Sequence, residues 1–347
     1  MSVRIPVGVL GATGMVGQEF VSFLQDHPWF DLTFLAASDR SAGKKYHEAT
    51  TWRLGGETPA YVRDIVVSDS VPKNAPKLVF SAMDASVATE IEQAFAAAGH
   101  VIVSNSRNHR MDADVPLLVP EANGDHLDLL PAQNARGWSG RIVTNPNCST
   151  VVLVMALAPL KQFGIEKVIV TTMQAISGAG YPGVASLDIL GNVVPFIGGE
   201  EPKMESETQK ILGTFADGKI VPLSAKVSAS CNRVPVVDGH TMCVSVELEQ
   251  KPTEHEIIAA LNGFRGLPQK KNLPSAPAQP VVYMEQENRP QPRRDVERDN
   301  GMAVFVGRLR KCPVLDYKFV AMGHNTVRGA AGAAVLNAEL MHAQGLL

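Results

Sequence analysis

A glycine-rich turn between a short apolar run and a helical run constrains the fold of this chain more than any other feature. The apolar run, Ile5 to Leu10, is typical of a buried strand, and the turn Gly11-Ala-Thr-Gly14-Met-Val-Gly17 follows at once. A helix is expected from about Met15 to Gln25. Glycines in such a turn let the backbone approach a pyrophosphate that faces the helix N-terminus. The GxGxxG spacing itself is absent, and a plain tight turn is the alternative, but the flanking strand and helix favour a dinucleotide site.

Strands and helices continue to alternate beyond this turn, which predicts an α/β fold with a Rossmann-type doubly wound parallel sheet. After residue 148 the strands are β-branched or alternate apolar with polar residues, which predicts an α+β part with a mixed or antiparallel sheet. The length of 347 residues predicts two domains. The expected strands are Leu32 to Ala37, Lys77 to Ala82, His100 to Asn105, Lys167 to Ala175, Met242 to Glu249, Ala303 to Leu309 and Tyr317 to Met322. The expected helices are Ser86 to Ala98, Ser149 to Lys161, Thr253 to Phe264 and Val327 to His342, and Leu267 to Arg294 is expected to be an irregular surface excursion.

Composition and charge argue against several classes of partner. The net charge of −3 gives no support for binding of nucleic acid, which usually needs a basic patch. No apolar run reaches the length of a membrane span, and no secretory leader is visible. The four cysteines show no metal-ligand spacing. A reduced, cytoplasmic compartment therefore fits best, and no metal, nucleic-acid or membrane partner is expected.

One cysteine stands at a position that suits chemistry. Cys148 lies where an extended run, Arg141 to Asn145, gives way to the helical run that starts at Ser149. A helix N-terminus stabilises a nearby negative charge, so the pKa of this thiol is expected to fall. Free backbone N–H groups at the same turn could hold an oxyanion. The alternative is a buried structural cysteine, since free cysteine is among the most buried residue types.

The end of the second expected strand bears on the choice between NADP and NAD. An NAD site usually presents Asp or Glu to the ribose hydroxyls at this distance from the glycine turn. Here the sequence is Ala37-Ser-Asp-Arg-Ser-Ala-Gly-Lys44, in which hydroxyls and cations suit a 2′-phosphate. Asp39 could favour NAD, and a solvated polar turn is the other alternative. The pattern favours NADP, with Ser38, Arg40 and Ser41 as its contacts.

Several segments, in order along the chain, carry a resemblance to one known family. They are Gly8 to Gly17, Ser104 to Asp112, Val119 to Asn123, Asn145 to Thr150, Gln174 to Gly180, Arg233 to His240 and Gly323 to Ala331. Together these segments resemble the aspartate-semialdehyde dehydrogenase family over nearly the whole chain. The segment Pro195 to Met204 is more similar to the fungal and archaeal branch than to the typical bacterial one.

The resemblance implies an NADP-dependent oxidoreductase that works through a thioester. In that family a cysteine thiolate attacks the aldehyde carbon of aspartate semialdehyde, hydride passes to NADP, and phosphate releases the acyl group as aspartyl phosphate. The cellular reaction runs in reverse and feeds the synthesis of threonine, methionine and, in many organisms, lysine. The expected partners are a small-molecule substrate and inorganic phosphate.

The resemblance also implies a role for single residues. Cys148 matches the nucleophile and His240 the acid–base histidine that takes the thiol proton and returns it. Gln174 is expected to position the acyl group and Asn147 to polarise the carbonyl oxygen. Arg233 matches the residue that binds the substrate carboxylate. Glu200 matches the acid that binds the substrate amine, with Glu201 as the alternative. Arg110 and Lys203 match the residues that bind phosphate, and Arg107 lies near them in the sequence. The expected cofactor contacts are Gly11, Ala12, Thr13, Gly14, Met15, Val16, Ser38, Arg40, Ser41, Ser177, Gly178, Asn325 and Thr326.

The same resemblance implies an arrangement of domains and subunits. Residues 1–147 plus 325–347 are expected to form the NADP-binding domain, and residues 148–324 the catalytic and oligomerisation domain. The family forms dimers or dimer-based tetramers, and the fungal-like features favour a tetramer. Three alternatives stay open: malonyl-CoA reductase or another acyl-phosphate reductase of the same superfamily, a silent NADP-binding module, and a Cys–His hydrolase.

Overall fold

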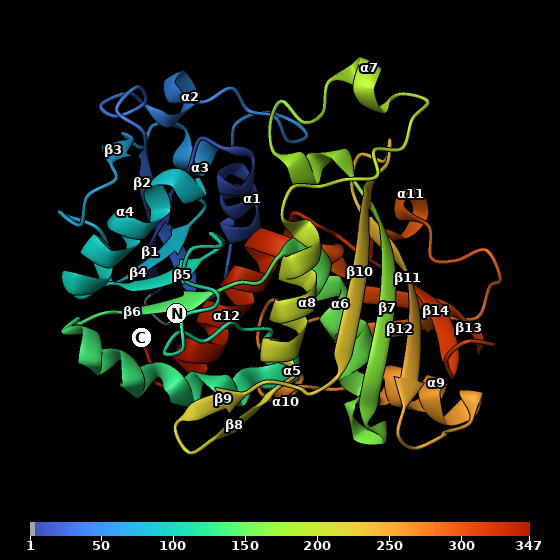
Figure 1. The fold of residues 1–347 in the computed structure, drawn as a ribbon. Helices are drawn as coiled ribbons and strands as arrows, with labels where there is room; N and C mark the ends of the chain where they lie inside the picture. Colours follow the sequence, from blue (N-terminus) through green and yellow to red (C-terminus); the bar gives the residue numbers. More distant parts are fainter. Residues whose placement is uncertain (1–3) are drawn as a thin grey trace.

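The computed structural model describes residues 4–347 and contains two six-stranded sheets, one from each half of the chain (Figure 1). In the first sheet all pairings are parallel and the strand order is 3-2-1-4-5-6, the Rossmann order. Parallel strands share one carboxyl edge, and the glycine turn lies on it, after β1. The strands are β1 (Ile5–Leu10), β2 (Phe30–Ala37), β3 (Ser68–Asp69), β4 (Leu78–Ser81), β5 (Val101–Ser104) and β6 (Arg141–Thr144).

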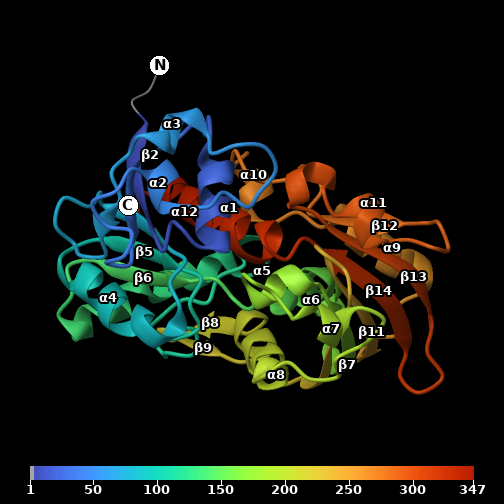
Figure 2. The same ribbon diagram turned by 90° about the horizontal axis from the view of Figure 1, so that it is seen from above.

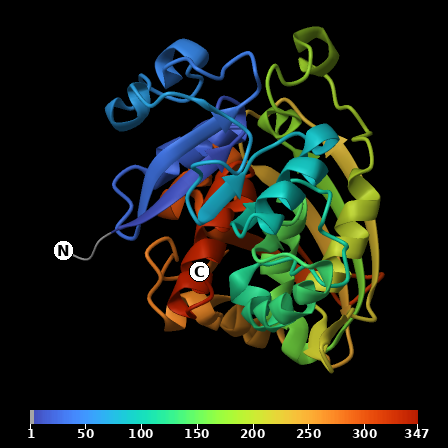
Figure 3. The same ribbon diagram turned by 90° about the vertical axis from the view of Figure 1, so that its left-hand side faces the viewer.

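Helices cover both faces of the first sheet. Helix α4 (Ala85–Ala97) packs Phe95 on one face, and α1 (Met15–Leu24) packs Phe20 and Val21 on the other. The last helix of the chain, α12 (Gly332–Ala343), joins α1 in the same apolar core. Figures 2 and 3 show this red helix beside the blue strands, which stand at the other end of the sequence. The expectation that the closing helix packs onto the first sheet is confirmed.

The second sheet is mixed, as the sequence predicts. Its order is β10-β7-β11-β14-β13-β12, with parallel pairs only at its two edges. Along β7 and β11 buried residues alternate with more exposed ones, because one face packs on α6 (Cys148–Leu157) and α8 (Glu200–Ile211). The strands are β7 (Ile165–Gln174), β10 (Lys226–Arg233), β11 (His240–Leu248), β12 (Val281–Met284), β13 (Val304–Lys311) and β14 (Tyr317–Gly323).

Shorter elements complete the chain. Helix α9 (Glu254–Gly263) begins with the expected capping box, in which Thr253 and Glu256 exchange hydrogen bonds. The loop that carries α7 (Ser186–Ile189) projects away from the sheets (Figure 1). No helix within residues 4–347 is long and apolar enough to span a lipid bilayer. The other short elements are α2 (Tyr46–Ala49), α3 (Ala60–Arg63), α5 (Pro120–Asn123), α10 (Leu267–Lys270), α11 (Pro292–Asp295), β8 (Thr214–Ala216) and β9 (Lys219–Val221).

Two expected elements differ from the structure. The segment Leu267 to Arg294 is not irregular throughout, because it contains α10, α11 and strand β12, which forms the edge of the second sheet beside β13. Pro280 precedes β12 directly, and proline is tolerated where a strand begins at a sheet edge. The helix expected from Val327 starts as a π-helical turn, Val327–Ala331, before α12. The expected division into domains at residues 147/148 and 324/325 stays a prediction.

Candidate active site

Three side chains of the second sheet converge because of its topology. Gln174 ends β7 and Arg233 ends β10 in the same parallel register. His240 begins β11, which runs antiparallel to β7, so it lies at the same end of the sheet. All three side chains are buried on the face that packs against α6. Cys148 is the first residue of α6 and meets them there.

Hydrogen bonds of the Asn147 side chain hold the turn that carries Cys148. The Oδ1 atom of Asn147 accepts the N–H groups of Ser149 and Thr150 at 2.9 and 3.1 Å, which caps α6. Its Nδ2 donates to Glu200 Oε1 at 2.8 Å. Only the second N–H of Nδ2 is therefore left for the carbonyl role that the sequence predicts. Gly329 packs against the other side of the turn, where a Cβ atom would lie 2.7 Å from Cys148 Cβ.

Cys148 and His240 are in contact. The Sγ atom lies 3.2 Å from His240 Nε2, and the ring is completely buried. The other ring nitrogen, Nδ1, accepts the backbone N–H of Ala175 at 3.1 Å. Gly178 covers the ring, and a Cβ atom there would lie 3.0 Å from His240 Cε1 and from Arg233 Nη1. A side chain at position 178 would therefore crowd both His240 and Arg233.

The expected fall in the pKa of the thiol is wrong for this structure. Protein atoms around Cys148 remove water from the thiol, which raises its pKa to about 12, although part of the residue opens into a cavity. The Glu200 carboxylate adds to the rise, whereas Arg110, Arg233 and the Ser149 N–H act in the opposite direction. Desolvation thus outweighs the helix N-terminus. In the resting site Cys148 is a neutral thiol.

The imidazole beside it is also neutral. Burial lowers the pKa of His240 to about 3, and the positive charges of Arg233 and His324 act in the same direction. A neutral thiol and a neutral imidazole therefore face each other.

A cavity of about 670 Å³ lies in front of the thiol and gathers the expected substrate residues. Arg233 Nη1 donates to Ala175 O at 2.7 Å, which fixes the guanidinium beside His240. Of the two neighbouring acids, Glu200 lines the cavity, whereas Glu201 accepts the N–H of Cys231. Gln174 is buried next to the site but does not line the cavity. The charged lining residues are Asp84, Arg107, Arg110, Glu200, Lys203 and Arg233.

Two further residues of α8 support the site and escaped the sequence analysis. Glu207 is buried, and its carboxylate accepts Arg110 Nη1 at 2.9 Å and the backbone N–H of Asn147 at 2.6 Å. Lys210 donates to three backbone carbonyls of residues 110, 112 and 115, at 2.7 to 2.9 Å. With residues 200 and 203 they form one stripe of α8 at spacings of three and four. In the sequence this charged stripe is typical of a solvated helix face, which is why it was missed.

The glycine turn has the shape of a phosphate cradle. Gly11 adopts φ +72°, and a Cβ atom there would lie 2.6 Å from Ala82 O. Gly14 caps α1 without any side-chain hydrogen bond, so the N–H groups of the first helical turn stay open to an anion. The turn therefore fits a dinucleotide pyrophosphate. Ser38, Arg40 and Ser41 follow the adjacent strand β2 in a turn that is mostly exposed.

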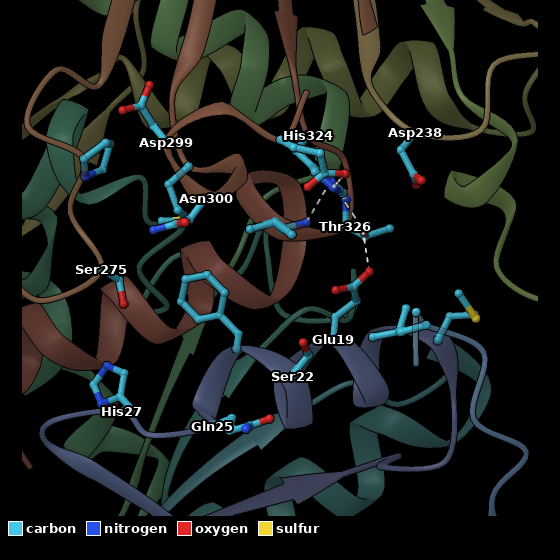
Figure 4. A pocket seen from close by; sticks show the side chains of 18 of the residues that line it. Glu19, Ser22, Gln25, His27, Asp238, Ser275, Asp299, Asn300, His324 and Thr326 are labelled. Carbon is cyan, nitrogen blue, oxygen red and sulfur yellow. Dashed lines mark hydrogen bonds and ion pairs between the residues drawn. The ribbon is translucent and has the colours of Figure 1, made fainter. Parts of the chain in front are cut away.

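The remaining expected cofactor residues join the two sheets. Asn325 Nδ2 donates to Ser177 Oγ at 2.7 Å, and its Oδ1 accepts the N–H of Gly239 at 2.8 Å. Thr326 donates to Glu19 of α1 at 2.9 Å, as Figure 4 shows. Both ends of the Asn325 amide are thus engaged within the protein, which suits a positioning role next to the cofactor.

A second and larger cavity, of about 900 Å³, lies between α1 and residues 297–302 (Figure 4). Three of the expected cofactor residues line it, Met15, Ser177 and Thr326. Gly178 and Ala179 line the cavity of Cys148, so a single turn separates the two spaces. Met15, Ser177 and Thr326 thus lie on one side of this turn, and Gly178 lies with the thiol on the other.

Comparison with known proteins decides the family. A family model described as semialdehyde dehydrogenase, NAD binding domain, matches residues 6–130, and one described as semialdehyde dehydrogenase, dimerisation domain, matches residues 157–328. An aspartate-semialdehyde dehydrogenase of Methanothermobacter thermautotrophicus is 53% identical over 344 residues, which cover 97% of this chain and 99% of that protein. The chain belongs to the aspartate-semialdehyde dehydrogenase family.

Other members of the aspartate-semialdehyde dehydrogenase family agree in sequence and in structure. The Saccharomyces cerevisiae protein is 46% identical over 358 residues, with 98% of both chains covered. The structure of the Candida albicans aspartate-semialdehyde dehydrogenase with NADP matches with a TM-score of 0.92 at 43% identity, over 99% of this chain and all of that one. The resemblance to the fungal and archaeal branch, the fold class and the enzyme class are confirmed.

Proposed function

We propose that this chain catalyses the reversible, NADP-dependent reductive dephosphorylation of L-aspartyl-4-phosphate to L-aspartate 4-semialdehyde through a thioester on Cys148. The observation that carries the proposal is the contact between Cys148 and His240 at the edge of a cavity lined by cations. Thiols at such sites form acyl intermediates. The relatives named aspartate-semialdehyde dehydrogenase support the same substrate.

Five of the six charged residues of the cavity, all except Asp84, have a task in this proposal. Arg233 binds the substrate carboxylate through its planar guanidinium, and Glu200 accepts the substrate amine. Arg110 and Lys203 bind the phosphoryl group, with Arg107 near them. Gln174 positions the acyl group from the end of β7. The presence of both a carboxylate grip and an amine acceptor favours an amino-acid substrate over a CoA thioester.

NADP is the cofactor of this proposal, and its site is built from the glycine turn and the end of β2. The backbone of residues 11–16 would hold the pyrophosphate, and Ser38, Arg40 and Ser41 the 2′-phosphate. Ser177, Gly178, Asn325 and Thr326 would lie at the other end of the cofactor. When bound, NADP accepts or supplies the hydride. Support for NADP over NAD comes from the cations after β2 and from the relative solved with NADP.

The chain has a dimerisation domain, which supports a homo-oligomer. Five large apolar side chains are exposed on the projecting loop around α7, at Tyr181, Leu187, Leu190, Val193 and Phe196. Exposed apolar side chains in such number suit a subunit contact. We propose a dimer or a dimer-based tetramer, in the cytoplasm, serving the synthesis of threonine, methionine and lysine. Light scattering of the purified protein measures the oligomeric state.

A phosphate-dependent assay tests the function. With L-aspartate 4-semialdehyde and NADP, formation of NADPH is expected to require inorganic phosphate, because phosphate must release the acyl group from Cys148. Absorbance of NADPH is followed with phosphate, without phosphate, and with NAD in place of NADP. A protein that reduces malonyl-CoA with NADPH and shows no phosphate-dependent reaction would overturn the proposal in favour of malonyl-CoA reductase.

The buried carboxylate of Glu207 gives a sharper test of the phosphate site. Glu207→Gln removes the negative charge that holds Arg110 and the N–H of Asn147, so the KM for phosphate is expected to rise and kcat to fall. Charge-assisted hydrogen bonds of about 1.5–3 kcal/mol correspond to about tenfold to a hundredfold in kcat/KM. Steady-state kinetics with varied phosphate measure this change.

The control for Glu207 comes from the same helix. Glu205 accepts the backbone N–H of Ala229, away from the cavity, so Glu205→Gln is expected to leave the KM for phosphate unchanged. The KM for NADP is expected to stay constant in both variants. Equal kinetic constants for Glu207→Gln and Glu205→Gln would contradict the role given to Glu207.

A further inference from the structure

Arg53 and Tyr181 come from different halves of the chain and are in contact. The guanidinium carbon of Arg53 lies 3.3 Å from the centroid of the Tyr181 ring, so the cation lies over the aromatic face. Arg53 belongs to the loop between α2 and α3, and Tyr181 stands in the projecting loop that carries α7. Figures 1 and 3 show these two loops approaching each other. This contact, called the Arg53–Tyr181 stack below, bridges the two halves of the chain.

A buried glutamine ties the Arg53 side of the stack to the glycine turn. Gln18 of α1 is completely buried, and its Nε2 donates to the carbonyls of Thr13 and Thr51 at 3.1 and 3.2 Å. Its Oε1 accepts the backbone N–H of Arg53 at 2.8 Å. The loop of Arg53 is therefore fixed relative to the turn that is expected to hold the pyrophosphate of the cofactor.

The Tyr181 side of the stack is joined to the other end of the expected cofactor site. Tyr181 lies four residues after Ser177, and Ser177 lines the same cavity of about 900 Å³ as Arg53. Further along the loop, Val194 exchanges two backbone hydrogen bonds with Arg233, at 2.8 and 3.0 Å, which holds the returning chain at the end of β10. A dinucleotide held by both the glycine turn and Ser177 would therefore have to pass the gap that the stack spans.

We propose that the Arg53–Tyr181 stack is a clasp across the cofactor cleft, and that it controls the rates at which NADP enters and leaves. The inference rests on the proposed function and deepens it. Both side chains are exposed, Tyr181 to 63%, so the stack is a surface contact that local motion breaks and remakes. The clasp is closed both before and after binding in this proposal. It therefore slows entry and release equally and leaves the Kd for NADP unchanged.

Binding kinetics of NADPH test the clasp through Tyr181→Leu. This variant removes the aromatic face but no charge, so the long-range attraction between the protein and the phosphates stays the same. We expect the rate constants of association and dissociation both to rise by about twofold to fivefold, the effect of losing one exposed cation–π contact, with an unchanged Kd. Stopped-flow fluorescence of NADPH at about 0.15 M salt measures both constants.

Two results would overturn the clasp. Unchanged rate constants in Tyr181→Leu would show that the stack does not limit entry or release. A higher Kd with an unchanged association rate constant would make Tyr181 a direct contact of the cofactor instead.

Further variants show whether the effect comes from the stack itself. Tyr181→Phe keeps the ring and is expected to have the rate constants of the wild type. Arg53→Ala combined with Tyr181→Leu is expected to release NADPH no faster than Tyr181→Leu alone, because the contact is already lost. Multiplied effects in the double variant would contradict the proposal. Arg63 is exposed on α3, so Arg63→Ala is the control for loss of a cation and is expected to release NADPH at the wild-type rate.

Hydrogen exchange of the protein without cofactor separates the clasp from the proposed function. Peptides that cover residues 51–57 and 177–194 are expected to exchange faster in Tyr181→Leu than in the wild type, because the two loops open more often. Peptides of α9, far from the stack, are expected to exchange equally. Equal exchange of the two loops in both proteins would overturn the clasp, whether or not the enzyme is active. The absence of phosphate-dependent turnover in the wild-type protein would refute the proposed function instead, and hydrogen exchange would still decide the clasp.

Discussion

Cys148→Ala is expected to lower kcat for L-aspartate 4-semialdehyde by about 10⁴-fold or more, the scale seen when a covalent nucleophile is removed. Without the sulfur no thioester can form. Turnover is measured at saturating semialdehyde, phosphate and NADP. Binding of NADP, followed by fluorescence, is expected to be unchanged, because the glycine turn lies in the first sheet.

Two other cysteines serve as controls for this loss. Cys231 is buried in the core of the second sheet and Cys243 is exposed on its other face, and neither lines the cavity. Cys243→Ala is expected to keep wild-type turnover, and Cys231→Ala to lose stability before activity. Full turnover by Cys148→Ala would refute the thioester mechanism, whatever the substrate.

Arg328→Met is expected to lower the free energy of unfolding by about 3–5 kcal/mol, the cost of leaving a buried charge without its partner. Arg328 and Glu121 are both completely buried, and two parallel hydrogen bonds of 2.8 and 2.7 Å join them. This ion pair links the turn before α12 to α5. Urea unfolding followed by circular dichroism measures the loss, and Glu121→Leu is expected to give a loss of similar size.

A double replacement separates two contributions to the free energy of unfolding: the cost of a buried charge without a partner and the stabilisation given by the ion pair itself. Arg328→Met combined with Glu121→Leu leaves no buried charge, so its loss of stability is expected to be smaller than the sum of the two single losses. The exposed pair of Lys45 and Asp64 is the control, and Lys45→Ala is expected to change stability little. Additive losses at the buried pair would contradict this account.

Local signals were enough to predict the elements that carry the chemistry. The glycine turn after β1 and the start of α6 at Cys148 follow from a few neighbouring residues, because strand, turn and cap are short-range features. Gln174, Arg233 and His240 came instead from the family resemblance. The sequence around each of these residues does not show that the three strand ends lie together, because this depends on how β7, β10 and β11 pair.

Tertiary features account for what sequence reasoning missed. The pKa of Cys148 depends on how much water the fold removes from the thiol, and this outweighs the helix N-terminus that the sequence shows. In the sequence Glu207 cannot be told from the other acids of a polar helix, because its partner Arg110 comes from a distant loop. The sequence does not predict strand β12, because its four apolar residues stand among prolines. These residues form a strand by pairing with β13.

The place of α12 in the first core has a consequence for how the protein is made. The chain is synthesised from its N-terminus. The strands of the first sheet therefore leave the ribosome long before Val335, Leu336 and Leu340, which share their apolar core. Until the whole second sheet has been translated, α12 cannot join α1 on that face of the first sheet. Cutting the gene between the two sheets would accordingly yield two unfinished halves.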